Sequence, residues 1–152
     1  MYREAILKKF RPGLDNILYI LHDLQDSNPQ RYLAKDDIRV CADYLNVPYS
    51  YVHSVASFYT MFSLEPRGRN IIRLCDSPPC HLMGSKSLLA YLKETLKVDV
   101  GGTTEDGKFT LELTSCLGAC GVAPVMMLND EMLGNLTPEK VDAILDRRRK
   151  ES

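Results

Sequence analysis

The sequence predicts an α+β protein, with an N-terminal helical bundle in residues 1–67 and a small sheet covered by helices in residues 68–152. Three observations lead to this prediction. Apolar residues recur at helical spacing as far as about Glu65, the period then becomes that of short strands, and the turn residues Pro66, Arg67 and Gly68 separate the two patterns. A chain of 152 residues has room for one or two domains.

Three amphipathic helices are expected in the first part. The first begins near Leu14 and ends before Asn28-Pro29, the second runs from about Ala34 to Asn46, and the third runs to Met61 from about Ser50, its expected N-cap. Their apolar residues recur at intervals of three and four: Leu14, Ile17, Leu18, Leu21 and Leu24; Ile38, Cys41, Ala42 and Leu45; Val52, Val55, Ala56, Tyr59 and Phe62. The acidic residues Asp36, Asp37 and Asp43 fall mostly outside these faces.

Strands and helices follow one another in the second part. A short apolar strand, residues 71–74, ends at Cys75, and a helix with Leu88, Leu92 and Leu96 on one face follows from Gly84. Residues 109–113 alternate as a half-buried strand, and residues 125–128 and 131–133 are expected to pair through a turn at Asn129-Asp130. Thr137-Pro138-Glu139 should cap a last helix that runs to about Arg149.

Composition excludes several classes of protein. Lys and Arg number 19 against 20 Asp and Glu, so there is no basic field for a nucleic-acid backbone. The first twenty residues lack the apolar core of a signal peptide, and no apolar stretch approaches the roughly 20 residues of a membrane span. We therefore expect a cytoplasmic protein that would reach a membrane only through a partner. Its five cysteines are expected to be reduced thiols or metal ligands.

Four of the five cysteines form two close pairs, Cys75-x4-Cys80 and Cys116-x3-Cys120, each at the end of a predicted strand. A [2Fe-2S] cluster needs four thiolates, two on each iron, and two paired loops supply that number. Pro78-Pro79, Gly118 and Gly121 favour the curvature that brings two sulfurs of one loop together. The spacing therefore favours a [2Fe-2S] cluster.

Two other sites remain open on spacing alone. A zinc site with four cysteines also uses two close pairs, although usually with C-x2-C spacing. A thioredoxin-like thiol–disulfide oxidoreductase places its cysteines between a strand and a helix, and Lys86 or His81 could lower a thiol pKa there, but a second pair would have no role. Cys41 lies on an apolar helix face and is left out of the site. His81 is expected beside the ligands, and His22 and His53 in helices.

Three groups of residues match, in order, the pattern of a known family. They are Cys75-x4-Cys80-x3-Gly84; Gly102-Thr103-Thr104-x-Asp106-Gly107-x-Phe109-Thr110; and Cys116-Leu117-Gly118-Ala119-Cys120 with Ala123-Pro124-Val125. The chain resembles the 24 kDa-type thioredoxin-like [2Fe-2S] subunit of NADH dehydrogenases. Residues 52–62 and 134–139 also match that family, so the resemblance covers most of the chain from about Leu33 to Leu145.

The resemblance implies a thioredoxin-like [2Fe-2S] domain after the helical bundle, with Cys75, Cys80, Cys116 and Cys120 as ligands of one cluster. It also implies partners. These are a flavoprotein subunit that binds FMN and NAD(P)(H) and further iron–sulfur subunits, as in complex I, NAD-linked formate dehydrogenases and bidirectional or electron-bifurcating hydrogenases. The sequence has no Gly-rich dinucleotide motif, in agreement with nucleotide binding on a partner.

Docking on that flavoprotein is expected to involve the helical part. Phe58, Tyr59 and Phe62 are the residues we expect to contribute, since Tyr and Phe are enriched at the centres of interfaces. Aromatic residues at helical spacing are also typical of a core, so the sequence leaves both interpretations open.

Overall fold

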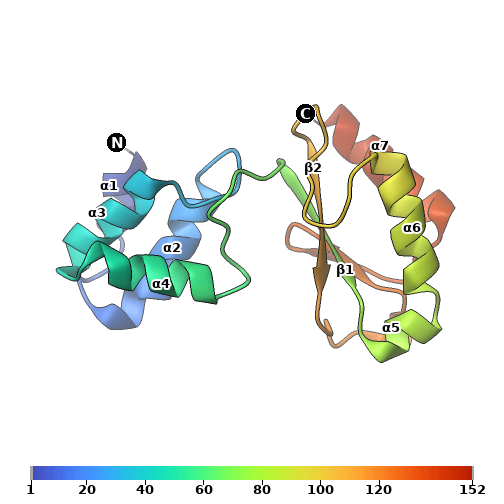
Figure 1. The fold of residues 1–152 in the computed structure, drawn as a ribbon, viewed down its shortest axis with the longest axis horizontal. Coiled ribbons are helices and arrows are strands. Elements are labelled where there is room, and N and C mark those ends of the chain that lie inside the picture. Colours follow the sequence, from blue (N-terminus) through green and yellow to red (C-terminus); the bar gives the residue numbers. More distant parts are fainter. Residues whose placement is uncertain (1, 152) are drawn as a thin grey trace. The chain divides into compact units, whose positions relative to one another are not determined.

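The computed structural model describes residues 2–151, which form two compact units, one ending at Arg67 and the other beginning at Gly68 (Figure 1). Each unit has its own hydrophobic core, and all four paired cysteines belong to the second unit. Within the described residues, no helix is both long and apolar enough to cross a membrane.

The first unit is helical. It contains α1 (Tyr2–Leu7), a 3-10 turn (Leu14–Asn16), α2 (Ile17–Asp26), α3 (Lys35–Leu45) and α4 (Tyr49–Phe58). The helix α3 packs against α1, α2 and α4, and α1 also packs against α2. The core residues are Ile6, Leu7, Ile17, Ile20, Leu21, Leu24, Leu33, Ile38, Cys41, Ala42, Leu45, Val52, Ala56 and Phe62. The expected packing of helices on apolar faces is thus confirmed.

Several details of the first unit differ from the sequence prediction. The short helix α1 was not expected, and α4 begins at Tyr49 after the N-cap residue Pro48, so the prediction of Ser50 as the cap is wrong. Proline at this position has a fixed φ, and its carbonyl accepts the first backbone hydrogen bond, from the N–H of Tyr51 (3.0 Å). The helix ends at Phe58, before the expected Met61.

A buried carboxylate joins α1 to the start of α3. Asp37 is completely buried, although the apolar pattern placed it mostly outside the core face. Its carboxylate accepts hydrogen bonds from Nε of Arg3 (2.6 Å), from the hydroxyl of Tyr2 (3.2 Å) and from the backbone N–H of Ala34 (2.8 Å). The last of these is the return bond that an acidic residue in the first helical turn makes to the cap residue.

The second unit is a four-stranded sheet with strand order β2-β1-β3-β4. The strands are β1 (Asn70–Cys75), β2 (Phe109–Thr114), β3 (Met126–Leu128) and β4 (Glu131–Leu133). β1 and β2 are parallel, whereas β3 is antiparallel to both β1 and β4. The helix α6 (Ser85–Leu96) connects the two parallel strands, as a parallel pairing requires. The strands expected at residues 71–74, 109–113, 125–128 and 131–133 are confirmed.

One face of the sheet is covered by α6 and by the last helix, α7 (Pro138–Lys150) (Figure 1). The core between them is formed by Ile72, Leu74, Leu88, Leu92, Leu96, Phe109, Leu111, Met126, Leu128, Leu136, Val141 and Leu145. The hydroxyl of Thr137 accepts a hydrogen bond from the N–H of Lys140 (3.3 Å), which confirms the predicted N-cap.

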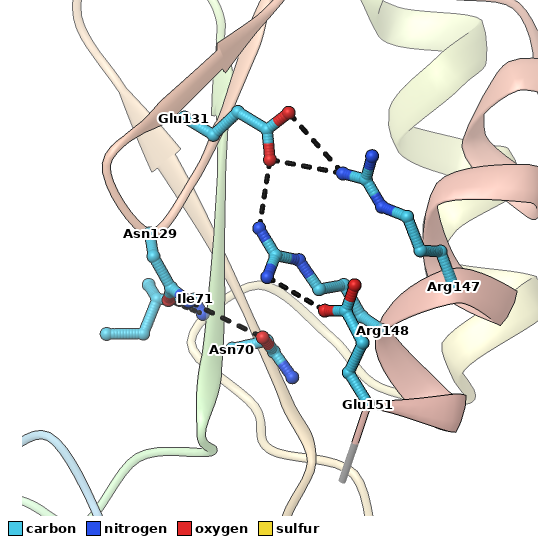
Figure 2. Close-up of polar contacts among 7 residues, drawn as sticks. All are labelled: Asn70, Ile71, Asn129, Glu131, Arg147, Arg148 and Glu151. Carbon is cyan, nitrogen blue, oxygen red and sulfur yellow. Dashed lines mark hydrogen bonds and ion pairs between the residues drawn. The ribbon is translucent and has the colours of Figure 1, made fainter.

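Polar contacts fix the β3–β4 hairpin to its neighbours (Figure 2). Asn129 has the positive φ of 54° that its turn requires, and its side-chain oxygen accepts a hydrogen bond from the N–H of Ile71 (2.9 Å). The carboxylate of Glu131 forms ion pairs with the guanidinium groups of Arg147 (3.1 Å) and Arg148 (2.9 Å) of α7. The predicted turn at Asn129-Asp130 is therefore present and is tied to both β1 and α7.

The start of the second unit has a close backbone approach at Gly68. A Cβ atom there would lie 2.7 Å from the carbonyl carbon of Phe109. The N–H of Gly68 donates to the buried hydroxyl of Thr110 (2.6 Å). Glycine thus lets the chain enter β1 directly beside β2.

Candidate metal centre

The parallel pairing of β1 and β2 places the two cysteine pairs at the same end of the sheet. Cys75 is the last residue of β1 and is aligned with Thr114, the last residue of β2, two positions before Cys116. Both strands point the same way, so their carboxyl ends meet at one edge. The expectation that each pair follows a strand is confirmed.

Short helical turns carry the second cysteine of each pair. Cys80 lies in the short helix α5 (Pro78–Leu82), whereas a loop was expected before this cysteine. Pro78 and Pro79 are compatible with a helix at its first positions, where no backbone donor is needed. Cys120 begins a 3-10 turn (Cys120–Val122).

The four thiols of Cys75, Cys80, Cys116 and Cys120 interact with one another, and we refer to them as the thiol cluster. The sulfurs of Cys116 and Cys120 are 3.9 Å apart. Burial and the neighbouring Cys75 raise the pKa of Cys80, and the hydrogen bond and charge of Cys116 raise the pKa of Cys120. Cys75 also acts on Cys120, so the interactions join the two pairs.

Backbone N–H groups point at these sulfurs. Gly118, at a φ of 77°, donates its N–H to Sγ of Cys116 (3.3 Å). Burial would raise the pKa of Cys75, but hydrogen bonds from the backbone of Ser77, from Cys80 and from the backbone of Leu117 outweigh it and lower that pKa. Amide donors of this kind stabilise the negative charge of thiolates bound to iron. The donor set and its surroundings therefore fit a [2Fe-2S] cluster.

The thiol cluster has a buried side and an exposed side. Cys75 and Cys80 are 1% and 2% exposed and pack with Ala123 and Val125, whereas Cys116 and Cys120 are exposed. Sequence reasoning did not assign Ala123 and Val125 to the site, although both belong to a motif quoted for the resemblance. A site of this form keeps water from one pair of sulfurs and presents the other pair at the surface.

The remaining candidate ligands lie elsewhere. Cys41 is in the core of the helical unit, where burial raises its pKa to about 12. His22 and His53 are also in the helical unit, and His81 is an exposed residue of α5. Among residues 2–151, no three His, Cys, Asp or Glu side chains converge as ligands of a single metal ion.

Comparison with known proteins decides the family. The model of the thioredoxin-like [2Fe-2S] ferredoxin family matches residues 3–149. The chain belongs to this family. Its cofactor is accordingly one [2Fe-2S] cluster, and neither the zinc site nor the thiol–disulfide oxidoreductase is favoured.

Several bacterial proteins that are named as subunits of NADH-quinone oxidoreductase are close in sequence. The Rickettsia bellii protein is 41% identical over 147 residues, which cover 96% of this chain and 88% of that protein. The Escherichia coli K12 protein is 43% identical over 146 residues, with coverages of 95% and 88%. The NADP-reducing hydrogenase subunit HndA of Solidesulfovibrio fructosivorans is 33% identical and has coverages of 95% and 85%.

The fold also occurs in a solved enzyme. The structure of the NAD+-reducing [NiFe]-hydrogenase in its H2-reduced state matches 93% of this chain with a TM-score of 0.81. The identity is 21%, and the match spans only 23% of that longer chain, so it is a likeness of fold. The helical unit and the sheet unit therefore occur together in another protein.

Proposed function

We propose that the chain is a one-electron transfer subunit of an NAD(P)H-linked oxidoreductase complex, with Cys75, Cys80, Cys116 and Cys120 as the ligands of its cluster. The observation that carries this proposal is the placement of two cysteine pairs at the carboxyl ends of two adjacent parallel strands, with amide donors aimed at the sulfurs. The relatives named as subunits of NADH-quinone oxidoreductase and of a hydrogenase support it.

The residues around the thiol cluster have distinct tasks in this proposal. A bound [2Fe-2S] cluster accepts and releases one electron at a time, whereas a hydride supplies two to a flavin. Cys75 and Cys80, together with Ala123 and Val125, exclude water from one side. The backbone of Leu117 and Gly118 donates hydrogen bonds that offset negative charge, and Cys116 and Cys120 present the surface through which an electron can pass.

The electron partner in this proposal is a flavoprotein subunit that binds FMN and NAD(P)(H), with further iron–sulfur subunits beyond it. Such a partner would perform the two-electron chemistry, and the chain described here would take electrons from it one at a time. We also propose that the complex works in the cytoplasm, because none of the five cysteines forms a disulfide, as is usual in a reducing compartment. Membrane association would occur only through other subunits.

Replacing the proposed ligands one at a time tests the site. We expect the serine variants of Cys75, Cys80, Cys116 and Cys120 to lose most of the about two irons and two acid-labile sulfides per chain, and to lose the rhombic EPR signal of the reduced protein. The matched control is Cys41→Ala, which removes a thiol outside the site and should keep all three properties. Colourless wild-type protein with one zinc ion, or a cluster lost only in the Cys41 variant, would overturn the proposal.

A further inference from the structure

The hydroxyl of Ser77 takes no part in the helix that it precedes. Ser77 is the N-cap residue of α5, and its carbonyl accepts a hydrogen bond from the backbone N–H of His81 (2.9 Å). A serine at this position usually accepts a side-chain hydrogen bond from the N–H of the second or third helical residue. The second residue here is Pro79, which has no N–H, and the side chain of Ser77 makes no cap hydrogen bond. The hydroxyl is therefore available to another group.

That group is the sulfur of Cys75. Ser77 lies two positions after Cys75, the last residue of β1, in the turn that leads to Cys80. Burial would raise the pKa of Cys75, but hydrogen bonds from the backbone of Ser77, from Cys80, from the backbone of Leu117 and from the side chain of Ser77 lower it. Ser77 thus supplies both an N–H and an O–H donor to the same sulfur.

The two cysteine pairs differ at the corresponding position. In the second pair, the residue two positions after the first cysteine is Gly118, whose N–H donates to Sγ of Cys116 (3.3 Å). Glycine has no side chain and adds no second donor there. Cys116 is exposed and accessible to water, whereas Cys75 is only 1% exposed. The hydroxyl of Ser77 therefore supplies the buried sulfur with a donor that the exposed sulfur can obtain from solvent.

A donor on a ligand sulfur favours the reduced form of an iron–sulfur cluster. Reduction adds one electron and therefore one negative charge, and the reduction potential depends on hydrogen bonds to the sulfurs and on solvent exposure. Burial disfavours the more highly charged state. A hydrogen bond to sulfur stabilises that state and acts against burial, so a hydroxyl beside Cys75 should raise the reduction potential.

We propose that Ser77 sets the potential of this centre: its hydroxyl donates a hydrogen bond to the Cys75 sulfur of the bound cluster and makes the cluster easier to reduce. This inference rests on the proposed function, in which Cys75 is a ligand and the cluster passes single electrons. Ser77 itself neither binds iron nor accepts an electron. Its hydroxyl keeps its proton, and only the negative charge on the group that it faces changes with the oxidation state.

Potentiometric titrations of the cluster-loaded full chain, followed by EPR, test the role of this hydroxyl. We expect Ser77→Ala to lower the equilibrium constant for reduction about tenfold, which is a fall of about 59 mV in the midpoint potential of a one-electron couple. Ser77→Thr keeps the hydroxyl and should stay within about threefold of the wild type. The matched control is Ser115→Ala, which removes an exposed hydroxyl next to Cys116 and should also stay within about threefold.

A second measurement separates hydrogen bonding from a change in the shape of the turn. Pulsed EPR of the reduced protein prepared in deuterated water detects exchangeable deuterons close to the cluster. The wild type and Ser77→Thr should share one strongly coupled deuteron that Ser77→Ala lacks, because a hydroxyl carries a single donor hydrogen. The urea midpoint of unfolding should be nearly the same in all three proteins, since the hydroxyl makes no cap hydrogen bond.

The iron and sulfide content of the same preparations separates this inference from the proposed function. A Ser77→Ala protein with a full cluster and an unchanged potential would overturn the inference and leave the proposed function standing. Equal falls in Ser77→Ala and Ser77→Thr would show that the hydroxyl is not the cause, with the same consequence. If Ser77→Ala loses its cluster, Ser77→Gly, which copies the residue of the second pair, supplies the potential; loss of the cluster from both would assign the hydroxyl to cluster assembly and also overturn the inference. A wild-type preparation without a cluster would contradict the proposed function itself.

Discussion

Cysteine occurs in two opposite settings in this chain. The four thiols of the thiol cluster receive hydrogen bonds and affect one another, whereas Cys41 is fully buried among aliphatic residues of the helical unit. Burial in apolar surroundings disfavours the thiolate, so its pKa rises from 9.0 to about 12. Because the thiolate is the reactive form, Cys41 should behave as an inert core residue.

Alkylation tests this behaviour directly. At about pH 8 only about one Cys41 side chain in ten thousand would be a thiolate at a pKa near 12, so iodoacetamide should leave it unmodified in the folded protein. The reaction should accelerate as the pH rises toward that pKa, and also at pH 8 once urea unfolds the chain and restores an ordinary pKa. Peptide mass spectrometry gives the extent at each residue. Equal rates for Cys41 in folded and unfolded protein would contradict the assigned burial.

The ligand residues could be predicted from sequence because their chemistry is local. Two close cysteine pairs restrict the possible sites before any fold is known. The hydrogen bonds from Leu117 and Val125 could not be predicted in the same way, since they come from backbone groups whose position depends on the fold. The same holds for Asp37, whose partner Arg3 is 34 residues away in sequence.

At the scale of whole elements, length decided which helices could be predicted from the sequence. The helices α3, α6 and α7 have 11, 12 and 13 residues, long enough for an apolar stripe to be recognised. The helices α1 and α5 have six and five residues, too short to show a stripe or to be stable alone. Such helices exist because tertiary contacts hold them, and for α1 the main polar contact is the group around Asp37.

Removing the Asp37 carboxylate should therefore loosen α1 from α3. Asp37→Ala leaves the N–H of Ala34 and the guanidinium of Arg3 without their acceptor, and we expect the free energy of unfolding to fall by about 2–3 kcal/mol. Urea titration followed by far-UV circular dichroism measures this loss. The control is Asp36→Ala, which removes the exposed carboxylate next in sequence and should cost less than about 0.5 kcal/mol. Equal losses in the two variants would contradict a special role of the buried carboxylate.

At the scale of the whole molecule, each of the two units has a hydrophobic core of its own. Within residues 2–151, the buried residues of the helical core end at Phe62, and those of the sheet core begin at Ile72. Arg67 closes the first unit by donating from its backbone N–H to Gln30 (2.8 Å) and from its side chain to the carbonyl of Arg31 (2.7 Å). The sequence marked this boundary through a change of period and the turn residues near Gly68.

Because every proposed ligand and every amide donor aimed at the thiol cluster lies after this boundary, the sheet unit should assemble the cluster without the helical unit. We expect a fragment of residues 68–152 to fold and to bind about two irons and two sulfides, with the same EPR g-values as the full chain. The full chain purified in parallel is the control. If the fragment folded but could not hold iron, the helical unit would have to contribute to the metal centre, and the conclusion that the sheet unit alone holds the cluster would be wrong.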